Sequence, residues 1–263
     1  MNLIDRIDNY LVEGERRERV SYYPSEVSKC LRQLYYKFTK EPETNPISPG
    51  GFWKMRMGDK IHDLIFEFLE KSGLEIVNEI GFKEDIGLKY PISGRMDNLF
   101  IDEDDSLSGI EVKSTYGAGI RNIVKKGYPK EQDIEQILVY MGCTNVERFY
   151  LIYLGRDDGY RTQYIIERNN GEIFCNNRKV HTDFGTLTKR FAVLEEAVTY
   201  REIPNREYLV AIKNGEIKSK FQKDKIEYKS DWQCLYCQFM IKCWEGIVSY
   251  HMHDDNSDMF KNE

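Results

Sequence analysis

Two neighbouring segments decide the fold: residues 92–101, ISGRMDNLFI, and residues 109–114, GIEVKS. Both have the composition of strands, and the polar stretch DEDDS at residues 102–106 is typical of a turn, so a β-hairpin is predicted. Asp97 and Glu111 are equally distant from the middle of this turn. A symmetric hairpin therefore sets them opposite each other, with Cβ atoms about 5 Å apart on one face.

Two carboxylates this close repel each other unless a cation lies between them, and oxygen ligands of this kind suit Mg²⁺ or Mn²⁺. The period of two along a strand places Lys113 on the same face as Glu111. Two acids and a lysine around a hard metal ion indicate hydrolysis of a phosphodiester. An acid-x-lysine triplet alone is more often a solvated strand face, and a slip of one residue would separate the acids. The apolar flanks of Asp97 favour the site, because a charge in a buried strand needs a reason.

Composition places the chain among soluble globular proteins. Its 263 residues are 41% hydrophobic and 31% charged, which is ordinary for that class. No apolar run approaches the roughly 20 residues that cross a bilayer, and the N-terminus lacks the apolar stretch of a signal peptide, so we expect a cytoplasmic protein without membrane contact. The net charge of −6 argues against general coating of nucleic acid but permits a local basic groove.

Four of the six cysteines form a candidate metal centre. Cys234, Cys237 and Cys243 make a C-x2-C-x5-C cluster, and a tetrahedral site or a cubane cluster requires a fourth ligand from elsewhere. Cys30 is the expected donor, within a helix predicted to be capped at Ser25. An isolated cysteine plus a compact triplet favours an iron–sulfur cluster, and a structural zinc held by the same thiolates is the alternative.

The residues around this cluster and the remaining cysteines have simpler expected roles. Trp232, Phe239 and Trp244 are expected to shield the cluster from water. Cys143 and Cys175 lack ligand spacing and are predicted to be small core residues, since thiols stay reduced in the cytosol.

Residues 52–71 have the apolar period of a helix, with Gly58 and His62 at positions i and i+4 on the border of the apolar stripe. A lone histidine there is more often a satisfied core residue. A neutral imidazole beside two carboxylates would instead complete a metal site and favour Mn²⁺. Glycine lowers helix stability by about 1 kcal/mol relative to alanine, so Gly58 predicts a close backbone approach.

A second helix is predicted over residues 134–141 and ends at Gly142. Its Gln136 and Tyr140 share one face at positions i and i+4 and could reach toward Glu111. An exposed glutamine beside a half-buried tyrosine is the simpler interpretation.

Two basic segments are candidates for contact with phosphates. Residues 121–130 hold four cations around Tyr128 and are predicted to be a loop with a stacking aromatic, although a solvated basic loop is as common. Residues 213–229 carry six lysines against three acids and are a weaker candidate for the same role.

Taken in order along the chain, these motifs resemble the RecB-like branch of the PD-(D/E)XK nucleases. More narrowly, they are similar to the iron–sulfur members typified by the Cas-four exonucleases of CRISPR systems and their phage relatives. The resemblance runs from about residue 25 to residue 244. It is carried by Cys30, Gly58-x3-His62, Gly94-x2-Asp97, Glu111-x-Lys113, Gln136-x3-Tyr140 and C-x2-C-x5-C at residues 234–243.

The resemblance implies an α/β fold with a mixed β-sheet flanked by helices, in which an iron–sulfur region joins the N- and C-terminal segments. It implies cleavage of DNA, often single-stranded and from an end. The implied ligands of the catalytic Mg²⁺ or Mn²⁺ are His62, Asp97, Glu111 and the backbone carbonyl of Val112. Lys113 is implied to orient or activate water, with Gln136 and Tyr140 positioning substrate or lysine, and Cys30, Cys234, Cys237 and Cys243 to hold a [4Fe-4S] cluster.

One nuclease domain is predicted over residues 1–263. Strands are expected at residues 149–154 and 161–166, and a helix at residues 183–201. The predicted parts are an N-terminal helical segment with the first cysteine (20–50), the nuclease core (52–166), a family-specific helical and basic insertion (167–230), a cluster-binding segment (231–250) and a flexible tail (251–263).

Other classes of function compete with the nuclease. The main one is a DNA-binding adaptor of a CRISPR adaptation or phage recombination complex with little nuclease activity, and a third is a redox or DNA-damage sensor built around the cluster. The intact set of two acids and a lysine argues against an inactive site. Expected partners are DNA and CRISPR integration or phage recombination proteins, and cleavage polarity and oligomeric state stay open.

Overall fold

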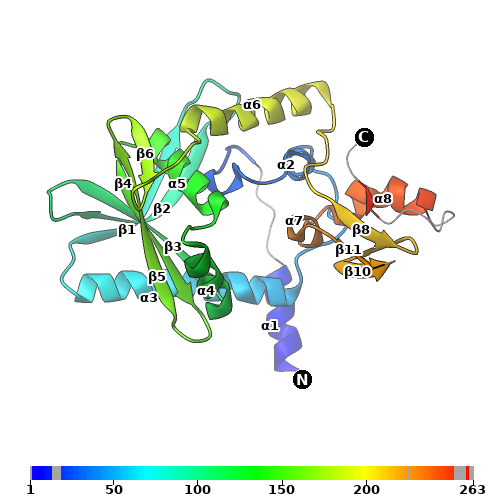
Figure 1. Cartoon of the computed structure of the whole chain (residues 1–263), viewed down its shortest axis with the longest axis horizontal. Coiled ribbons are helices and arrows are strands. Elements are labelled where there is room, and N and C mark those ends of the chain that lie inside the picture. Colours follow the sequence, from blue (N-terminus) through cyan, green and yellow to red (C-terminus); the bar gives the residue numbers. More distant parts are fainter. Residues whose placement is uncertain (1, 14–18, 224, 252–258, 261–263) are drawn as a thin grey trace. The chain divides into compact units, whose positions relative to one another are not determined.

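The computed structural model describes residues 2–13, 19–223, 225–251 and 259–260 (Figure 1). The chain divides into two compact units. The first contains Met1–Ser28 and Pro49–Ala192, and the second contains Lys29–Ser48 and Val193–Glu263. Among the described residues, no helix combines the length and apolarity that spanning a membrane requires.

The first unit is built around a seven-stranded sheet whose strands follow each other in chain order. Neighbouring strands are antiparallel except for β3 and β4, which are parallel. Parallel neighbours require a long crossover, and here it contains two helices, α4 and α5. The predicted mixed α/β fold is thus confirmed. The strands are β1 (Ile76–Glu84), β2 (Ile92–Ile101), β3 (Leu107–Thr115), β4 (Arg148–Gly155), β5 (Arg161–Asn169), β6 (Glu172–Cys175) and β7 (Arg178–Lys179).

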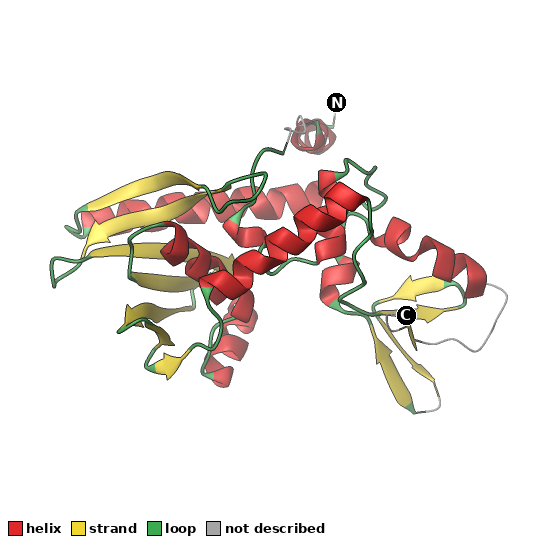
Figure 2. Cartoon of the chain, turned by 90° about the horizontal axis from the view of Figure 1, so that it is seen from above, coloured by secondary structure: helices red, strands yellow, loops and turns green. Residues whose placement is uncertain are grey.

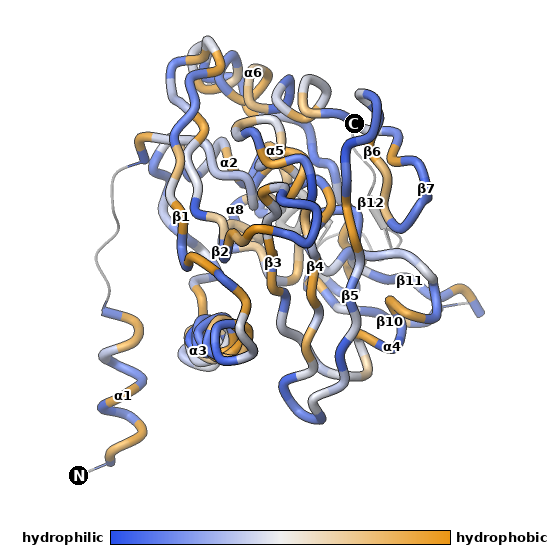
Figure 3. Tube along the Cα trace, turned by 90° about the vertical axis from the view of Figure 1, so that its left-hand side faces the viewer, coloured by the Kyte–Doolittle hydropathy of each residue, from blue (hydrophilic) through white to orange (hydrophobic). Residues whose placement is uncertain are grey.

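Helices cover the central strands of this sheet (Figure 2). Ile61 and Ile65 of α3 pack against Ile110 and Val112 of β3, while α5 contacts β1 and β2 and α4 contacts β4 and β5. Figure 3 shows the resulting hydrophobic stretches along β3 and β4. Five consecutive residues of β3 are buried, as expected for a strand covered on both faces. The helices are α1 (Leu3–Val12), α3 (Pro49–Lys71), α4 (Gly117–Lys126), α5 (Glu131–Cys143) and the first part of α6 (Phe184–Tyr200).

The predicted helix ends differ from the observed ones where packing overrides local signals. Gly142 does not end α5, which continues to Cys143. A Cβ atom at this glycine would lie 2.2 Å from the ring of Phe184, so Gly142 permits close packing instead of terminating the helix. The helix predicted over residues 183–201 is confirmed, and Asp183 Oδ1 accepts a hydrogen bond from Thr186 N at its start (2.7 Å).

The predicted hairpin register is confirmed, and the ladder ends just short of the two acids. Asn98 pairs with Ile110 and Ile101 with Leu107, so one further step would pair Asp97 with Glu111. At that step the Val112 amide instead donates to Asp97 Oδ2 (2.8 Å). Beyond this point β2 pairs with β1 and β3 pairs with β4. The two hairpin strands therefore separate at Asp97.

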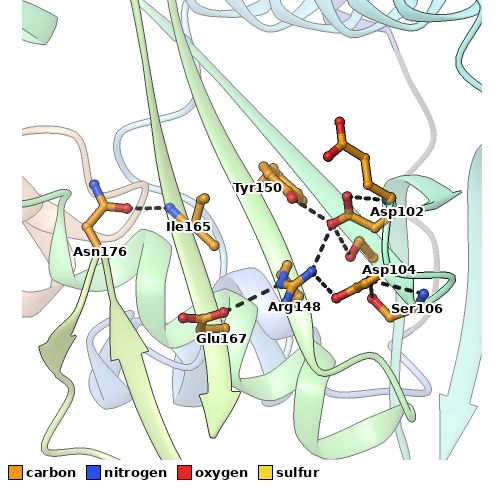
Figure 4. Close-up of polar contacts among 10 residues, drawn as sticks. Asp102, Asp104, Ser106, Arg148, Tyr150, Ile165, Glu167 and Asn176 are labelled. Atoms are coloured by element: carbon orange, nitrogen blue, oxygen red, sulfur yellow. Dashed lines mark hydrogen bonds and ion pairs between the residues drawn. The ribbon is translucent and has the colours of Figure 1, made fainter.

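A clasp of charged side chains fixes the hairpin turn (Figure 4). Arg148 of β4 reaches Asp102 Oδ2 at 3.1 Å, Asp104 Oδ2 at 2.9 Å and Glu167 Oε2 at 3.5 Å. Tyr150 OH also donates to Asp102 Oδ2 (2.6 Å), and these hydrogen bonds lower the pKa of Asp102. The start and the middle of the turn are thereby held to the neighbouring strand, which secures the register.

The second unit combines short helices with two small sheets, one of three strands in the order β12-β8-β9 and one formed by β10 and β11. The C-terminal tail expected at residues 251–263 lies outside the described residues except for His251 and the strand β12. The elements are α2 (Leu31–Phe38), the end of α6, β8 (Val210–Lys213), β9 (Glu216–Lys218), β10 (Lys220–Lys223), β11 (Ile226–Lys229), α7 (Trp232–Leu235), α8 (Met240–His251) and β12 (Met259–Phe260).

Removing the clasp is expected to destabilise the first unit. We expect Arg148→Ala to lower the free energy of unfolding by about 1–2 kcal/mol, because a network of charges stabilises a protein more than one exposed ion pair does. Urea unfolding measures this change. Arg168→Ala is the control, since Arg168 makes a single ion pair with Glu147 and its loss should cost less. Equal losses in both variants would contradict the role of the clasp.

Candidate functional site

Asp97 lies where regular pairing is interrupted on both sides of β2. The ladder with β3 stops at Asn98, and the ladder with β1 skips the position at which Glu79 would face Asp97. Glu79 has φ of 54°, in the left-handed region that non-glycine residues rarely adopt, and such strain is concentrated at functional sites. The Asp97 side chain is 18% exposed, so its carboxylate lies at an opening in the sheet.

His62 and Asp97 are in contact, as the predicted metal site requires. His62 Nδ1 lies 3.2 Å from Asp97 Oδ1, and the other carboxylate oxygen accepts from the Val112 amide. Burial lowers the pKa of His62, but the hydrogen bond and charge of Asp97 raise it more, so the net shift is upward. The imidazole side chain is 36% exposed, which leaves this side of the opening accessible from solvent.

Glu111 is the buried member of the pair. Its Oε1 atom lies 2.6 Å from Lys113 Nζ and accepts from Gln136 Nε2 at 3.0 Å. Its Oε2 atom is buried and has no hydrogen-bond partner among the described residues. Burial raises the pKa of this carboxyl, and the Lys113 ammonium opposes the rise. A buried acceptor without a partner costs about 1–3 kcal/mol, and more when charged, so this oxygen is suited to a cation.

Lys113, Gln136 and Tyr140 form one network with Glu111. Lys113 Nζ donates to Gln136 Oε1 (2.9 Å), and Gln136 Nε2 donates to Tyr140 OH (2.7 Å) as well as to Glu111. Tyr140 OH in turn donates to the carbonyl of Arg95 (3.3 Å). The helix α5 thus orients the lysine and the acid through a single buried amide. The six predicted side chains of this unit, from His62 to Tyr140, are brought together, and Val112, the seventh predicted residue, donates its amide to Asp97.

The four predicted cluster cysteines also converge, within the second unit. Cys30, Cys234, Cys237 and Cys243 line one cavity of about 30 Å³ together with Phe239 and Trp244. Cys30 was predicted to lie inside a helix capped at Ser25, and this prediction was wrong. Cys30 is the N-cap of α2, while residues 24–26 form a separate 3₁₀ turn.

Hydrogen bonds hold the segment after Cys30 against the segment of the other three cysteines. Asn45 Nδ2 donates to the carbonyl of Cys237 (3.0 Å), and the amide of Lys242 donates to Thr44 Oγ1 (3.1 Å). The first amide of α2, at Leu31, donates to Glu207 Oε2 (2.8 Å). The cavity walls are therefore tied together without any contribution from a bound metal.

Burial raises the pKa of three of the four thiols, those of Cys30, Cys234 and Cys237. Burial, followed by the neighbouring cysteines, raises the pKa of Cys234 to about 12, and burial raises that of Cys237 to about 11. Thiolates are the metal-binding form, so binding of a metal at this cavity would release protons from these thiols. Phe239 and Trp244 are buried, as expected for a shielding role, but Trp232 is 55% exposed and the prediction for it was wrong.

Sequence reasoning missed two arginines beside this cavity. Arg32 Nη1 lies 3.8 Å from Cys243 Sγ, and Arg206 donates to the carbonyl of Cys243 from Nη2 (2.7 Å) while stacking on Trp244. Only the spacing of Arg32 two residues after Cys30 could have indicated such a role. Arg206 is brought to the site by the tertiary fold.

The structure also corrects the predicted basic loop at residues 121–130. Most of this segment belongs to α4, and Arg121 is paired with Asp158 (2.6 Å). Tyr128 stacks under the guanidinium of Arg178, 4.6 Å from its ring centroid. The second basic segment, residues 213–229, forms the hairpins β8–β9 and β10–β11, so the predicted helical and basic insertion is largely β-structure after α6.

No side chains in the described ranges are arranged as a preformed single-ion site. No three histidine, cysteine, aspartate or glutamate residues there have positions that could hold a metal ion. Among the candidate site residues, Lys113 Nζ lies against Glu111 and His62 Nδ1 lies against Asp97. Binding a cation therefore requires these ion pairs to rearrange.

Comparisons with known proteins show a shared fold. No family model matches the sequence, and no curated protein matches it significantly. The solved structure of SSO0001 is similar, with a TM-score of 0.54 and 17% identity over 92% of this chain and 96% of that chain. An alkaline exonuclease from Laribacter hongkongensis, LHK-Exo, gives a TM-score of 0.49 and 17% identity over 70% of this chain and 93% of its own. Its complex with dAMP gives 0.48 and 15% over 75% and 96%. At 17% identity, the likeness to SSO0001 establishes the fold over nearly the whole chain.

Gly58 does not have the role that its position in α3 predicted. A Cβ atom there would lie 3.6 Å from Ser114 Oγ, an ordinary contact, so no close backbone approach requires glycine. We expect Gly58→Ala to stabilise the protein by about 0.5–1 kcal/mol, because alanine is the better helix former. Urea unfolding tests this, with Gly142→Ala as the control that should destabilise through its clash with Phe184. Destabilisation by both variants would contradict this account of Gly58.

Proposed function

We propose that this protein is a divalent-metal-dependent deoxyribonuclease with a PD-(D/E)XK-like core. The observation that carries the proposal is the buried, unpartnered Glu111 Oε2 beside the Asp97–His62 pair and Lys113. Two carboxylates, an imidazole and an ammonium in one opening fit a hard cation and a phosphodiester. The order of these residues along the chain, which resembles that of the PD-(D/E)XK nucleases, also supports the proposal.

Each residue has a role in the proposed reaction. Asp97 Oδ1, Glu111 Oε2, His62 and the Val112 carbonyl are the proposed ligands. A bound Mg²⁺ or Mn²⁺ lowers the pKa of water and offsets charge on the phosphate. Lys113 Nζ, fixed by Gln136, donates hydrogen bonds toward the attacked phosphate or the water.

Tyr140 acts one step further from the reaction. By accepting from Gln136 Nε2 and donating to the Arg95 carbonyl, it fixes the orientation of the amide that contacts both Lys113 and Glu111. Tyr140 is therefore proposed as a positioning residue. Exonuclease action on single-stranded ends, and CRISPR or phage proteins as partners, are further parts of the proposal that rest on the sequence resemblance.

Loss of either acid is expected to abolish cleavage. Asp97→Asn and Glu111→Gln should each reduce hydrolysis of end-labelled DNA with Mg²⁺ or Mn²⁺ by more than about 100-fold, since each removes an anionic ligand. Unfolding curves should stay close to that of the unaltered protein. Glu103→Gln, in the turn of the same hairpin, is the control that keeps activity. Full metal-dependent cleavage by both site variants would overturn the proposal, and DNA binding without any cleavage by the unaltered protein would favour the adaptor role.

We further propose that the cysteine cavity holds a structural [4Fe-4S] cluster. Four thiols surround a common space lined by Phe239 and Trp244, and four cysteines are the ligand set of such clusters. A single zinc ion with Zn–S bonds of about 2.3 Å draws its sulfurs within roughly 4 Å of each other. The sequence pattern of one distant cysteine and a compact triplet favours the larger cluster. Held by residues from two distant segments, it would cross-link the second unit.

Replacing one cluster cysteine is expected to remove the cluster and its stabilisation. Cys234→Ser, purified without oxygen, should be colourless, poorly soluble and depleted of iron and sulfide, because three thiolates hold the cluster weakly. Visible absorption and metal analysis measure this. Cys143→Ser is the matched control, a half-buried cysteine of the first unit that should keep the brown colour. An unaltered protein that contains zinc and no iron would contradict the assignment.

A further inference from the structure

A second pair of residues on the first unit is poised for substrate and is not used in the proposed chemistry. Tyr116 follows the end of β3, and Arg156 follows the end of the parallel strand β4. The guanidinium of Arg156 lies 5.4 Å from the ring centroid of Tyr116, within the range of a cation–π contact. Tyr116 is 55% exposed, so its ring is accessible from solvent.

Hydrogen bonds hold Arg156 in place, but no carboxylate in the described part of the chain forms an ion pair with its guanidinium. Its Nη1 atom donates to the carbonyl of Lys54 in α3 (3.1 Å), and its amide donates to the carbonyl of Thr115 (2.8 Å). Asp158 is paired with Arg121 (2.6 Å), and Asp157 accepts from the Gly117 amide (2.7 Å) while its charge also interacts with Arg156 at longer range. The cation is therefore held in place and available to an anion.

The surrounding backbone keeps this pair rigid. Asp157 binds the first amide of α4 directly after Tyr116, and a Cβ atom at Gly155 would lie 3.1 Å from the Cα atom of Gly117. The end of β4 and the start of α4 are thus in close contact. A preorganised aromatic and cation lose little entropy when a ligand binds.

The position of the pair relates it to the catalytic group. The alternation of side chains along β3 sets Tyr116, three residues beyond Lys113, on the opposite face from Lys113. The pairing of Thr115 with Gly155 places Arg156 alongside Tyr116. Arg156 contacts the carbonyl of Lys54 in α3, and Lys54 precedes His62 of the same helix by eight residues, roughly 12 Å at helix spacing.

We infer that Tyr116 and Arg156 form a platform for single-stranded DNA next to the proposed cleavage site, with Arg156 binding a phosphate and Tyr116 stacking on an unpaired base. This inference rests on the proposed function and specifies the form of its substrate. A duplex keeps its bases stacked on each other, so only an unpaired strand offers Tyr116 a base face. The platform thus favours single-stranded DNA.

Binding measurements without added divalent metal test the platform apart from catalysis. Fluorescence anisotropy with labelled oligo(dT) should show about tenfold weaker binding for Tyr116→Ala and unchanged binding for Tyr116→Phe, because stacking is worth about 1–3 kcal/mol per base. For Arg156→Gln, the slope of log K against log salt should fall by about 0.7, the value for one lost phosphate contact on a single strand.

The matched control is Arg178→Gln. Arg178 stacks on Tyr128 in the same way, but it lies on β7, four strands from β3 in the sheet, and its loss should change neither affinity nor slope. Unchanged binding in Tyr116→Ala and Arg156→Gln would overturn the platform, as would equal weakening of duplex binding by Tyr116→Ala. If the unaltered protein cleaves DNA while these variants bind normally, the platform fails and the nuclease proposal stands. If it neither binds nor cleaves DNA, both fail.

Discussion

The hydrogen bond from the Val112 amide to the Asp97 carboxylate is the interaction on which the candidate site depends. In a regular hairpin this amide would bond to a main-chain carbonyl of β2 and the sheet would stay closed. Asp97 Oδ2 accepts the hydrogen bond from the Val112 amide in place of that carbonyl. It thereby satisfies a buried donor, and the ladder between β2 and β3 ends at the same position. The irregular backbone of Glu79 on the other side of β2 completes the opening. A carboxylate, a buried amide and a gap in the sheet thus occur together because each requires the others.

Burial of the Glu111 carboxylate costs free energy of desolvation, and its contacts in the fold offset only part of that cost. One carboxylate oxygen is bound by Lys113 and Gln136, and the other is left without a partner among the described residues. Buried polar networks stabilise a protein when they are fully satisfied and destabilise it otherwise. The unpartnered oxygen of Glu111 is the feature of this network on which the proposed cation site rests. The Arg148 clasp and the packing of α3 on β3 supply the rigidity that keeps this arrangement in place.

The second unit has only a small hydrophobic core. Its elements are short, and the helices α2, α7 and α8 and the small sheets bury few large side chains around Trp244. Hydrogen bonds from Asn45 to the Cys237 carbonyl and from the Lys242 amide to Thr44 hold the two cysteine segments together. Small cores of this kind gain most from a cross-link between distant segments, which is the role proposed for the four cysteines that line this cavity.

The sequence by itself determined the hairpin, its register, the sharing of one face by Glu111 and Lys113, and the convergence of four cysteines. These follow from strand periodicity, turn composition and ligand spacing, which are local. Only the tertiary structure decided the role of Gly142, the capping position of Cys30, the exposure of Trp232 and the pairing of Arg121 with Asp158. Each of these depends on a side chain from a distant segment, such as Phe184 against Gly142. The period of apolar residues in a sequence indicates which face of a helix or strand is buried, but it does not indicate which distant segment covers that face.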